Sequence, residues 1–501
     1  MSVCRAEEEN TMKLRKLIEN MPYLLDTRGD MDTEIGSVVS DSRAAAENGV
    51  FFCIKGARSD AHDFAPQAMA NGCVALVVER YLDVDVPQVR VSNGRAAMSR
   101  MAAAFYGHPA QSMKLVGITG TKGKTTSSYM VKAICEQAGM KCGLIGTTGN
   151  MIGEKHIKSN LTTPDPIDLQ RTLRMMADEG VEVAVMEVSA HAIDMHRLDG
   201  LTFEVGCYTN LSQDHLDYFG SMENYFETKK RFFTSGMVRN ATCNADEDTT
   251  PDVLRDLTIP HITFGICEAA DLFARDIEIT ENGVSFCLQL RGMHNMEIHL
   301  RMTGMFNVYN ALAAASCALI LGITPDMICQ GLESIASVPG RIEMLPTKTP
   351  YKVILDYAHS PDALESFLKT VRTFTRSRMI AVFGCGGDRD KGKRPIMGEI
   401  GGRLADLCII TSDNPRTEDP MAIIAAIEEG IKLTGKPYVV IEDRREAIRH
   451  ALEIGQDGDV IVLAGKGHET YQEIMGVKRP FDEKIVVQEL LEEIQESGAQ
   501  E

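Results

Sequence analysis

The segment GTKGKTT at residues 120–126 contains the residue types that bind phosphate groups. It lies between an apolar segment, KLVGITG, and an amphipathic one, TTSSYMVKAICEQAG, which predict a strand and a helix. Backbone N–H groups of such a loop attract phosphate oxygens, Lys124 would reach the β and γ phosphates, and the Thr125 hydroxyl would hold Mg²⁺. Ile118 stands where the longer GxxxxGK[ST] pattern has glycine, and a GK[ST] triplet alone is common. The strand–loop–helix setting predicts ATP-phosphate contacts from Gly120, Thr121, Lys122, Gly123, Lys124, Thr125 and Thr126.

Acidic side chains and a histidine follow the next predicted strands. Glu187 lies in VEVAVMEVS, and the segment NLSQDHLDY places His215 between two acids. Carboxyl ends of parallel strands form the ligand-binding edge of an open α/β sheet, where a carboxylate can complete a Mg²⁺ shell. Glu187 could equally be a surface carboxylate, and Asp214 and Asp217 could cap the following turn. The position of Glu187 beside the phosphate loop favours the metal site.

Three glycine-rich or charged turns occur in the last third of the chain. They are GCGGDRDKGKR at residues 384–394, DNPR at 413–416 and GKGHE at 465–469. Each could be an ordinary turn, because Gly-Gly and Asn-Pro are common in loops. Since each follows a predicted strand, we expect the three to meet at one edge of a sheet and form a binding rim.

The elements that position these residues predict an α/β protein of three domains, at residues 1–112, 113–338 and 339–501. Continuous apolar strands between helices predict a central, mostly parallel sheet of the P-loop ATPase type. Between residues 274 and 303 a period-two pattern, with Asn282-Gly283 as a tight-turn signal, predicts an antiparallel appendage. Val338-Pro339-Gly340 predicts a hinge, beyond which the alternation resumes in a C-terminal Rossmann-like α/β domain.

The composition excludes several classes of function. The chain has 52 Lys and Arg against 71 Asp and Glu, a net charge of −19, which disfavours non-specific binding to nucleic acid or anionic lipid. Its 13 Cys show no paired CxxC spacing, as in a reducing compartment. The charged N-terminus lacks an apolar signal region, and the run ALAAASCALILG is too short to span a membrane. We expect a cytoplasmic protein with small-molecule partners and no membrane insertion.

The phosphate loop and the segments after it resemble those of the Mur ligases, ATP-dependent enzymes of peptidoglycan synthesis, and of the folylpolyglutamate synthetases. Periodicity alone does not choose between Lys229 and Lys230 in ENYFETKKRFF. The resemblance implies that His215 binds Mg²⁺ and, by its spacing, that Lys229 is carbamylated. A partly desolvated lysine can lose its proton and capture CO₂, which gives an anionic oxygen ligand. The implied catalytic residues are Lys124, Lys229, Glu187 and His215, and the implied metal ligands are Thr125, Glu187, His215 and Lys229.

The resemblance also implies substrate contacts. For the UDP-linked muramoyl dipeptide these are Ser40, Ser42, Thr162, Thr163, Ser189 and Arg197, although Met195 departs from the family's pattern. For adenine and ribose they are Asn307, Asn310, Arg341 and Asp356. For diaminopimelate they are Arg389, Asp413, Asn414, Pro415, Arg416, Gly465 and Glu469. The quartet DNPR is the family's diaminopimelate motif, and its Arg416 offers a planar fork to a carboxylate that lysine lacks.

The predicted activity is ATP-dependent addition of meso-diaminopimelate to the D-glutamate of a UDP-linked dipeptide. The resemblance implies an acyl-phosphate intermediate and Mg²⁺, and we expect a monomer. Two alternatives within the same superfamily are an L-lysine-adding relative and a folylpolyglutamate-type ligase. A nucleotide-binding NTPase without ligase chemistry is a third, disfavoured by the many strand-end motifs outside the phosphate loop.

Overall fold

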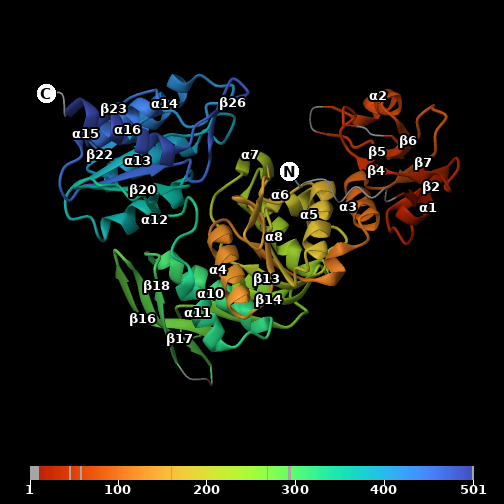
Figure 1. Ribbon diagram of the computed structural model, residues 1–501, viewed down its shortest axis with the longest axis horizontal. Helices are drawn as coiled ribbons and strands as arrows, with labels where there is room; N and C mark the ends of the chain where they lie inside the picture. Colours follow the sequence, from red (N-terminus) through yellow and green to blue (C-terminus); the bar gives the residue numbers. More distant parts are fainter. Residues whose placement is uncertain are drawn as a thin grey trace.

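Three β-sheets, each covered by helices, follow one another along the chain in the computed structural model (Figure 1). The structure describes residues 11–44, 47–56, 59–159, 161–267, 269–291 and 295–498. In Figure 1 the N-terminal and C-terminal sheets lie on opposite sides of the central part. Within the described ranges, no helix combines the length and apolar composition needed to cross a bilayer. Two small antiparallel pairs complete the sheets: β1 (Met12–Lys13) with β3 (Glu34–Ile35), and β25 (Tyr471–Ile474) with β26 (Val477–Pro480).

The central sheet has eleven strands in the order β11-β10-β9-β12-β8-β13-β14-β15-β16-β17-β18. The strands from β9 to β16 in this order pair in parallel, and the pairs at both edges are antiparallel. The predicted mostly parallel sheet with an antiparallel appendage is confirmed. The strands are β8 (Lys114–Thr119), β9 (Cys142–Gly146), β10 (Gly149–Ile152), β11 (Lys155–Ile157), β12 (Val183–Glu187), β13 (Phe203–Tyr208), β14 (Val238–Asn244), β15 (His261–Gly265), β16 (Leu272–Thr280), β17 (Gly283–Leu290) and β18 (Met296–Leu300).

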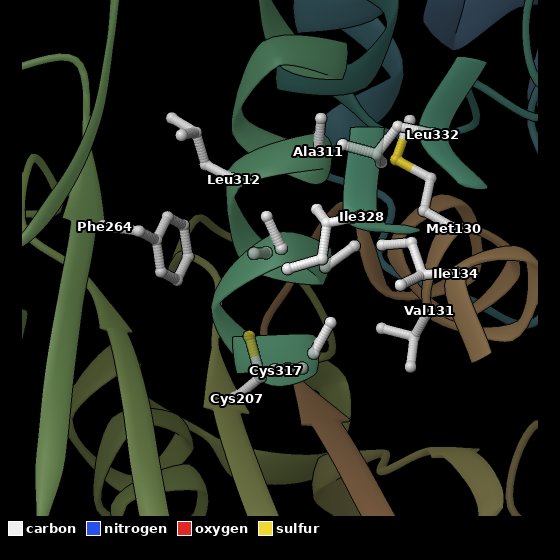
Figure 2. Packing of buried hydrophobic residues seen from close by; sticks show 14 of the residues in the cluster. Met130, Val131, Ile134, Cys207, Phe264, Ala311, Leu312, Cys317, Ile328 and Leu332 are labelled. Atoms are coloured by element: carbon white, nitrogen blue, oxygen red, sulfur yellow. The ribbon is translucent and has the colours of Figure 1, made fainter. Parts of the chain in front are cut away.

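Alternate residues of the parallel strands pack into two separate cores. On β8, Val116 and Ile118 join one core, whereas Leu115 joins the other. Figure 2 shows the first layer, where side chains of three helices meet beside the sheet. These helices are α4 (Lys124–Gln137), α10 (Met305–Ile320) and α11 (Pro325–Ser334). The opposite face carries α5 (Pro166–Asp178), α6 (Ala190–Asp194), α8 (Met222–Thr234) and α9 (Thr250–Arg255), with α7 (Leu216–Phe219) and the 3₁₀ helix η2 (Pro109–Ser112) in connections. Burial of both faces explains why these strands read as continuous apolar runs.

The appendage hairpin turns one residue earlier than the Asn282-Gly283 signal indicates. Thr280 pairs with Gly283, so the two-residue turn consists of Glu281 and Asn282. Gly283 belongs to β17, where an added Cβ would lie 1.8 Å from the Leu300 carbonyl oxygen of the next strand. The glycine therefore serves the close approach of β18 rather than the turn.

The N-terminal sheet has the order β2-β7-β6-β5-β4, with only β2 antiparallel to its neighbour. Its strands are β2 (Leu24–Arg28), β4 (Ser37–Val39), β5 (Gly49–Phe52), β6 (Cys73–Val78) and β7 (Gln88–Val91). Its helices are α1 (Leu14–Leu17), η1 (Ala61–Phe64), α2 (Ala65–Ala70) and α3 (Gly94–Phe105). The Ser99 hydroxyl on α3 donates to the His196 carbonyl at 2.5 Å, which joins this part to the central one.

The C-terminal sheet has the order β19-β20-β24-β21-β22-β23, parallel except for β19. Its strands are β19 (Glu343–Met344), β20 (Lys352–Asp356), β21 (Met379–Phe383), β22 (Leu407–Ile410), β23 (Tyr438–Val440) and β24 (Val460–Ala464). Helices α12 (Pro361–Arg372), α13 (Lys393–Leu404) and α14 (Pro420–Lys432) contribute to one core, and α15 (Arg444–Ile454) and α16 (Glu483–Gly498) to the other. This is the expected doubly covered α/β arrangement.

The connection between the last two sheets is tightly packed. Val338 is fully buried in the core of the central part. Two residues later, a Cβ added to Gly340, whose φ is 68°, would lie 2.4 Å from the His468 backbone nitrogen. The chain thus passes from one core to the next domain within a few residues, at the predicted hinge.

Candidate active site

The phosphate loop joins β8 to α4, and α4 begins at Lys124. Gly120 and Gly123 have φ values of 150° and 85°. A Cβ would lie 1.9 Å from Thr209 Oγ1 in the first case and 2.5 Å from Asn310 Oδ1 in the second, so both positions require glycine. The Lys124 ammonium donates to two loop carbonyl groups at 2.9 and 3.0 Å. Burial lowers its pKa to about 8, so a phosphate nearby would stabilise its charged form.

The Glu187 carboxylate is held against the first turn of α4. Glu187 ends β12 and is 1% exposed. Thr125 donates to its Oε2 at 3.0 Å, and Thr147 donates to Oε1 through its backbone N–H at 2.9 Å and to Oε2 through its hydroxyl at 3.0 Å. The guanidinium of Arg341 in turn donates to Thr125 Oγ1 at 3.1 Å. The C-terminal part of the chain therefore contacts the phosphate loop itself.

A cavity of about 530 Å³ opens onto this loop, and we call it the nucleotide cavity. Its lining includes the loop residues 121–126, Glu187, His215, Asn310, Arg341 and Asp356. Gly120 does not line it and contributes the carbonyl that accepts from Lys124. The cavity is formed jointly by the central and C-terminal parts.

The four residues expected at adenine and ribose do not all line the nucleotide cavity. Asn307 lies one helical turn before Asn310, whose amide donates to the Asn307 side-chain oxygen at 3.0 Å. Asn307 does not line the cavity, so it supports Asn310. Arg341 lies at the phosphate loop. The Asp356 carboxylate is fixed by the backbone N–H groups of residues 342 and 358, each at 2.8 Å, and burial raises its pKa.

Lys229 and Lys230 have opposite environments. Lys229 is 1% exposed, and its ammonium lies 4.5 Å from the centre of the Tyr225 ring. No described residue forms a hydrogen bond or ion pair with it, and burial and then Lys124 lower its pKa well below the ordinary value. The His215 ring lies 6.2 Å from the same Tyr225 ring. Lys230 is instead paired with Asp256 at 2.5 Å.

The residues expected to hold Mg²⁺ fit oxygen coordination in part. Among the described residues, no group of three or more His, Cys, Asp or Glu side chains could hold a metal ion. Thr125 and Glu187 nevertheless present a hydroxyl and a carboxylate together on the nucleotide cavity, the ligand types that Mg²⁺ uses beside phosphates. The Lys229 amine, buried without a polar partner among the described residues, has the environment in which a lysine becomes neutral and can capture CO₂. Burial lowers the pKa of His215 to about 4, which leaves the imidazole neutral and able to bind a metal.

A second cavity of about 440 Å³, which we call the amino-acid cavity, adjoins the first. The predicted residues in its lining are Thr162, Thr163, Ser189, Arg197, His215, Arg389, Asp413, Asn414, Arg416, Gly465 and Glu469. The predicted rim of the C-terminal sheet thus faces the central part. Pro415 is the remaining member of the DNPR turn, and its carbonyl oxygen would lie 1.9 Å from a Cβ at Gly387.

The DNPR turn is held by the turn GKGHE and by the β25–β26 hairpin. The Asn414 amide donates to Glu469 Oε2 at 2.8 Å, and the buried Lys466 donates to Asn414 Oδ1 at 3.0 Å. Arg416 has a φ of 52°, and its guanidinium donates to the Gly387 carbonyl at 2.7 Å. A left-handed backbone at a non-glycine residue is a mark of constraint, here imposed by the hairpin.

Burial and neighbouring charges together set the pKa values of the two rim carboxylates. Burial and then Asp413 raise the pKa of Glu469. Burial would raise the pKa of Asp413, but the nearby Lys466 and Arg444 outweigh it and lower that pKa. Gly465 has a φ of 118°, and a Cβ there would lie 2.4 Å from Asp413 Oδ2. Among the hydrogen bonds of the described residues, the Arg389 guanidinium makes one, to the carbonyl of the preceding residue at 3.2 Å.

The residues expected at the dipeptide form one network beside β12. The Thr163 hydroxyl donates to the Glu187 carbonyl at 2.7 Å and lies 3.1 Å from Ser189 Oγ, and Ser189 caps α6. Arg197 donates to the Thr163 carbonyl at 2.7 Å. Its guanidinium also lies 3.5 Å from the Met195 sulfur.

The two serines expected at the uridine nucleotide lie away from both cavities. Ser40 is exposed, whereas Ser42 is 7% exposed and donates to Gln67 Oε1 at 2.9 Å. The nucleotide and amino-acid cavities are lined by described residues from 121 onward only. The structure brings together the residues of the central and C-terminal parts, and leaves these two serines separate.

Several residues of the site were not predicted from the sequence. Tyr357 and His359 line both cavities, directly after β20. The segment KVILDYAH contains a signal for them, because polar side chains at the carboxyl end of a parallel strand face the ligand-binding edge. The buried Lys466 carried no such signal, since a lysine in a glycine-rich turn is usually exposed.

Comparisons with known proteins agree along nearly the whole chain. Family models match residues 34–106 (Mur ligase family, catalytic domain), 118–318 (Mur ligase middle domain) and 340–467 (Mur ligase, glutamate ligase domain). The UDP-N-acetylmuramoyl-L-alanyl-D-glutamate–2,6-diaminopimelate ligase 1 of Clostridium acetobutylicum is 45% identical over 489 residues, covering 96% of this chain and 100% of that protein. A solved structure of a UDP-N-acetylmuramoyl-L-alanyl-D-glutamate–2,6-diaminopimelate ligase has a TM-score of 0.68 at 32% identity, covering 97% of this chain and 99% of its own. Folylpolyglutamate synthase of Mycobacterium tuberculosis, at 20% identity and a TM-score of 0.62, covers 73% of this chain and 91% of its own, and shares the fold.

Proposed function

The chain belongs to the Mur ligase family of ATP-dependent amide ligases, and from this premise we propose its reaction. It joins meso-diaminopimelate to the D-glutamate carboxylate of UDP-N-acetylmuramoyl-L-alanyl-D-glutamate. The observation that carries this proposal is the pair of adjoining cavities, one on the phosphate loop and the other on Asn414, Arg416 and Glu469. The names of the most similar full-length relatives support the choice of substrates.

The first step is transfer of the γ-phosphoryl group of ATP to the glutamate carboxylate. The loop residues 121–126 hold the phosphates through backbone N–H groups at the start of α4. The Lys124 ammonium offsets the negative charge that develops on the transferred group. The products of this step are ADP and an acyl phosphate.

In the second step the amine of diaminopimelate attacks the acyl carbon. A tetrahedral intermediate forms, and its collapse releases phosphate and leaves the amide. Because carboxylate and amine enter from different cavities, catalysis consists mainly of holding them at the common boundary.

Magnesium neutralises phosphate charge when it is bound. Thr125 and Glu187 would hold one ion, and His215 with carbamylated Lys229 a second. This assignment is supported by the shared cavity of the first pair and by the burial of Lys229.

Selectivity for diaminopimelate follows from Arg416. Its guanidinium lies in the amino-acid cavity, fixed by Gly387, and is suited to the distal carboxylate of the substrate. Glu469 is suited to the distal ammonium. Lysine lacks that carboxylate, so the arginine would keep only the Gly387 carbonyl and Glu473, 3.8 Å away, and lose a contact worth about 1–3 kcal/mol.

The remaining parts of the proposal concern the whole molecule. The three sheets support domains at residues 1–112, 113–338 and 339–501, the first of which binds the uridine nucleotide through Ser40 and Ser42. We propose a cytoplasmic monomer.

A panel of amino acids tests the function. With the UDP-dipeptide and ATP, phosphate release and a new amide product are expected with meso-diaminopimelate, and at least about 30-fold less with L-lysine. Turnover with lysine in preference to diaminopimelate would overturn the substrate assignment. No turnover with any amino acid would overturn the ligase assignment.

A further inference from the structure

The nucleotide cavity and the amino-acid cavity share part of their lining. The residues common to both are Thr162, Ser189, Asp214, His215, Tyr357 and His359. The amide bond must form at this boundary, because the activated carboxyl group comes from the nucleotide side and the amine from the other. Any group that assists the attack must therefore be among these residues or reach them.

The attacking amine needs a proton acceptor. An amino acid carries its amine as ammonium near neutral pH, and the nitrogen has no lone pair for the acyl carbon until one proton has left. A positioned base that takes such a proton typically contributes about 10²–10⁴-fold to a rate. Four of the shared residues titrate, and three of them are poorly suited to this role.

The three are Asp214, His215 and Tyr357. The Asp214 carboxylate already faces two neighbours, because its Oδ2 lies 3.8 Å from both the Lys122 ammonium and His215 Nε2. His215 is the proposed Mg²⁺ ligand, and a coordinating nitrogen has no free lone pair. Burial raises the pKa of Tyr357, which keeps the phenol protonated.

The His359 ring is oriented for the task. Its Nδ1 lies 2.8 Å from the Tyr357 carbonyl oxygen. A carbonyl only accepts, so Nδ1 carries the proton and Nε2 has the lone pair. No described residue forms a hydrogen bond with Nε2. Two lysines hold the segment around the ring. Lys393 donates to the His359 carbonyl at 2.8 Å, and Lys122 donates to the side chain of the next residue, at Ser360 Oγ, at 2.5 Å.

We propose that His359 Nε2 accepts the proton of the incoming ammonium as its nitrogen attacks the acyl phosphate. This inference rests on the proposed function. The N–H bond to the lost proton breaks, the nitrogen lone pair forms the C–N bond, and the C–O bond to phosphate breaks in the collapse of the tetrahedral intermediate. The second proton leaves the nitrogen as the intermediate collapses and is taken up by the departing phosphate, which leaves the neutral amide. The imidazolium returns the first proton to water.

The charges around His359 make this base depend on the substrates. Burial, Lys393 on α13 and Lys122 in the phosphate loop lower its pKa to about 3, and Asp214 after β13 opposes them. The same two ammonium groups line or border the cavities that receive phosphates and carboxylates. Bound anions offset their charge, and the basicity of Nε2 rises when both substrates are in place.

The experiment compares two nucleophiles in His359→Gln and His359→Asn. The asparagine side chain can still donate to the Tyr357 carbonyl, so this variant controls for a loop displaced by loss of that hydrogen bond. Wild type and variants receive ATP and UDP-dipeptide, and the acyl phosphate is trapped by borohydride reduction. Amide formation is then measured with diaminopimelate and, separately, hydroxamate formation with hydroxylamine, which is already neutral near pH 7 and requires no base.

The expected result is selective. Acyl phosphate and hydroxamate should form within about twofold of wild type, while amide formation with saturating diaminopimelate should fall about 100-fold in both variants. Equal losses with the two nucleophiles, or unchanged amide formation, would overturn the role of His359. Failure of the wild type itself to make acyl phosphate would instead overturn the proposed function, and this inference with it.

Discussion

The Lys466 ammonium donates a hydrogen bond of 3.0 Å to the side-chain oxygen of Asn414, and the lysine is completely buried. It also donates to the Tyr471 carbonyl at 2.7 Å and lies 3.5 Å from Glu469 Oε2. One buried cation therefore connects two turns of the amino-acid cavity with the hairpin behind them. Such a fully paired group fixes the geometry of its neighbours.

We expect Lys466→Met to weaken amino-acid binding selectively. Loss of the buried cation removes one of the two hydrogen bonds to Asn414 Oδ1 and takes away the ammonium beside the Glu469 carboxylate. The KM for diaminopimelate should rise about 10-fold, or ~1.4 kcal/mol, while the KM for ATP stays within about twofold. Steady-state kinetics with each substrate varied provide the measurement. Lys484→Met, which removes a half-exposed lysine paired with Glu343, is the control; an equal rise in both KM values would contradict the assignment.

Arg416→Ala should abolish the preference for diaminopimelate over lysine. A charge-assisted, bidentate contact with a carboxylate is worth about 2–3 kcal/mol, so kcat/KM for diaminopimelate should fall at least about 30-fold. The rate with lysine should not fall by the same factor. Arg403→Ala, at an exposed arginine paired with Glu365, controls for loss of a surface charge. A parallel decrease with both amino acids would argue for a structural role instead.

Lys229→Ala and Lys230→Ala form a matched pair of adjacent lysines. The first should reduce ligation at least about 100-fold, and acetate or formate should restore part of it by supplying an anionic oxygen ligand. The second breaks ion pairs with Asp256 and Glu227, which line neither the nucleotide nor the amino-acid cavity, and should stay near wild type. Ligation rates of both variants, measured over a series of acetate or formate concentrations, test this rescue. Full activity of Lys229→Ala would refute the metal-ligand role.

Glu483→Gln should destabilise the C-terminal domain by about 3–5 kcal/mol. The Arg444–Glu483 pair, 2.8 Å apart, has both side chains 0% exposed, and the substitution removes the negative charge that this buried guanidinium faces, leaving it the carbonyl groups of Ser412 and Ala464. Calorimetry should show a lower midpoint for the transition of this domain. The double variant Arg444→Met, Glu483→Leu should recover part of the loss. Glu489→Gln, which breaks a half-exposed pair with Arg445, should cost less than about 1 kcal/mol.

Local patterns in the sequence predicted those features that depend on neighbouring residues. Strand, loop and helix around Lys124 were predicted because apolar periodicity and glycine placement are local signals. The hairpin was predicted one residue late, since Gly283 is required by the adjacent β18 and not by the turn. Burial of Lys229 rather than Lys230 could not be derived from periodicity, because it depends on which side of α8 faces the phosphate loop.

Local sequence patterns do not predict contacts between segments that are far apart in the chain. Arg341 and Thr125 are 216 residues apart, and their hydrogen bond exists only because the C-terminal domain docks on the phosphate loop. His359 became a site residue for the same reason, since it is the meeting of two domains that places it on both cavities. Docking of domains depends on whole surfaces, which single motifs do not describe.

The tightly packed connection at Val338–Gly340 determines how far different residues move if the C-terminal part rotates. If the C-terminal domain rotates there, each atom moves in proportion to its distance from the axis. Arg341 is next to that axis and would move little, so its hydrogen bond to Thr125 can persist. A modest rotation can therefore open the amino-acid cavity, which both parts of the chain line, while the contact with the phosphate loop is kept.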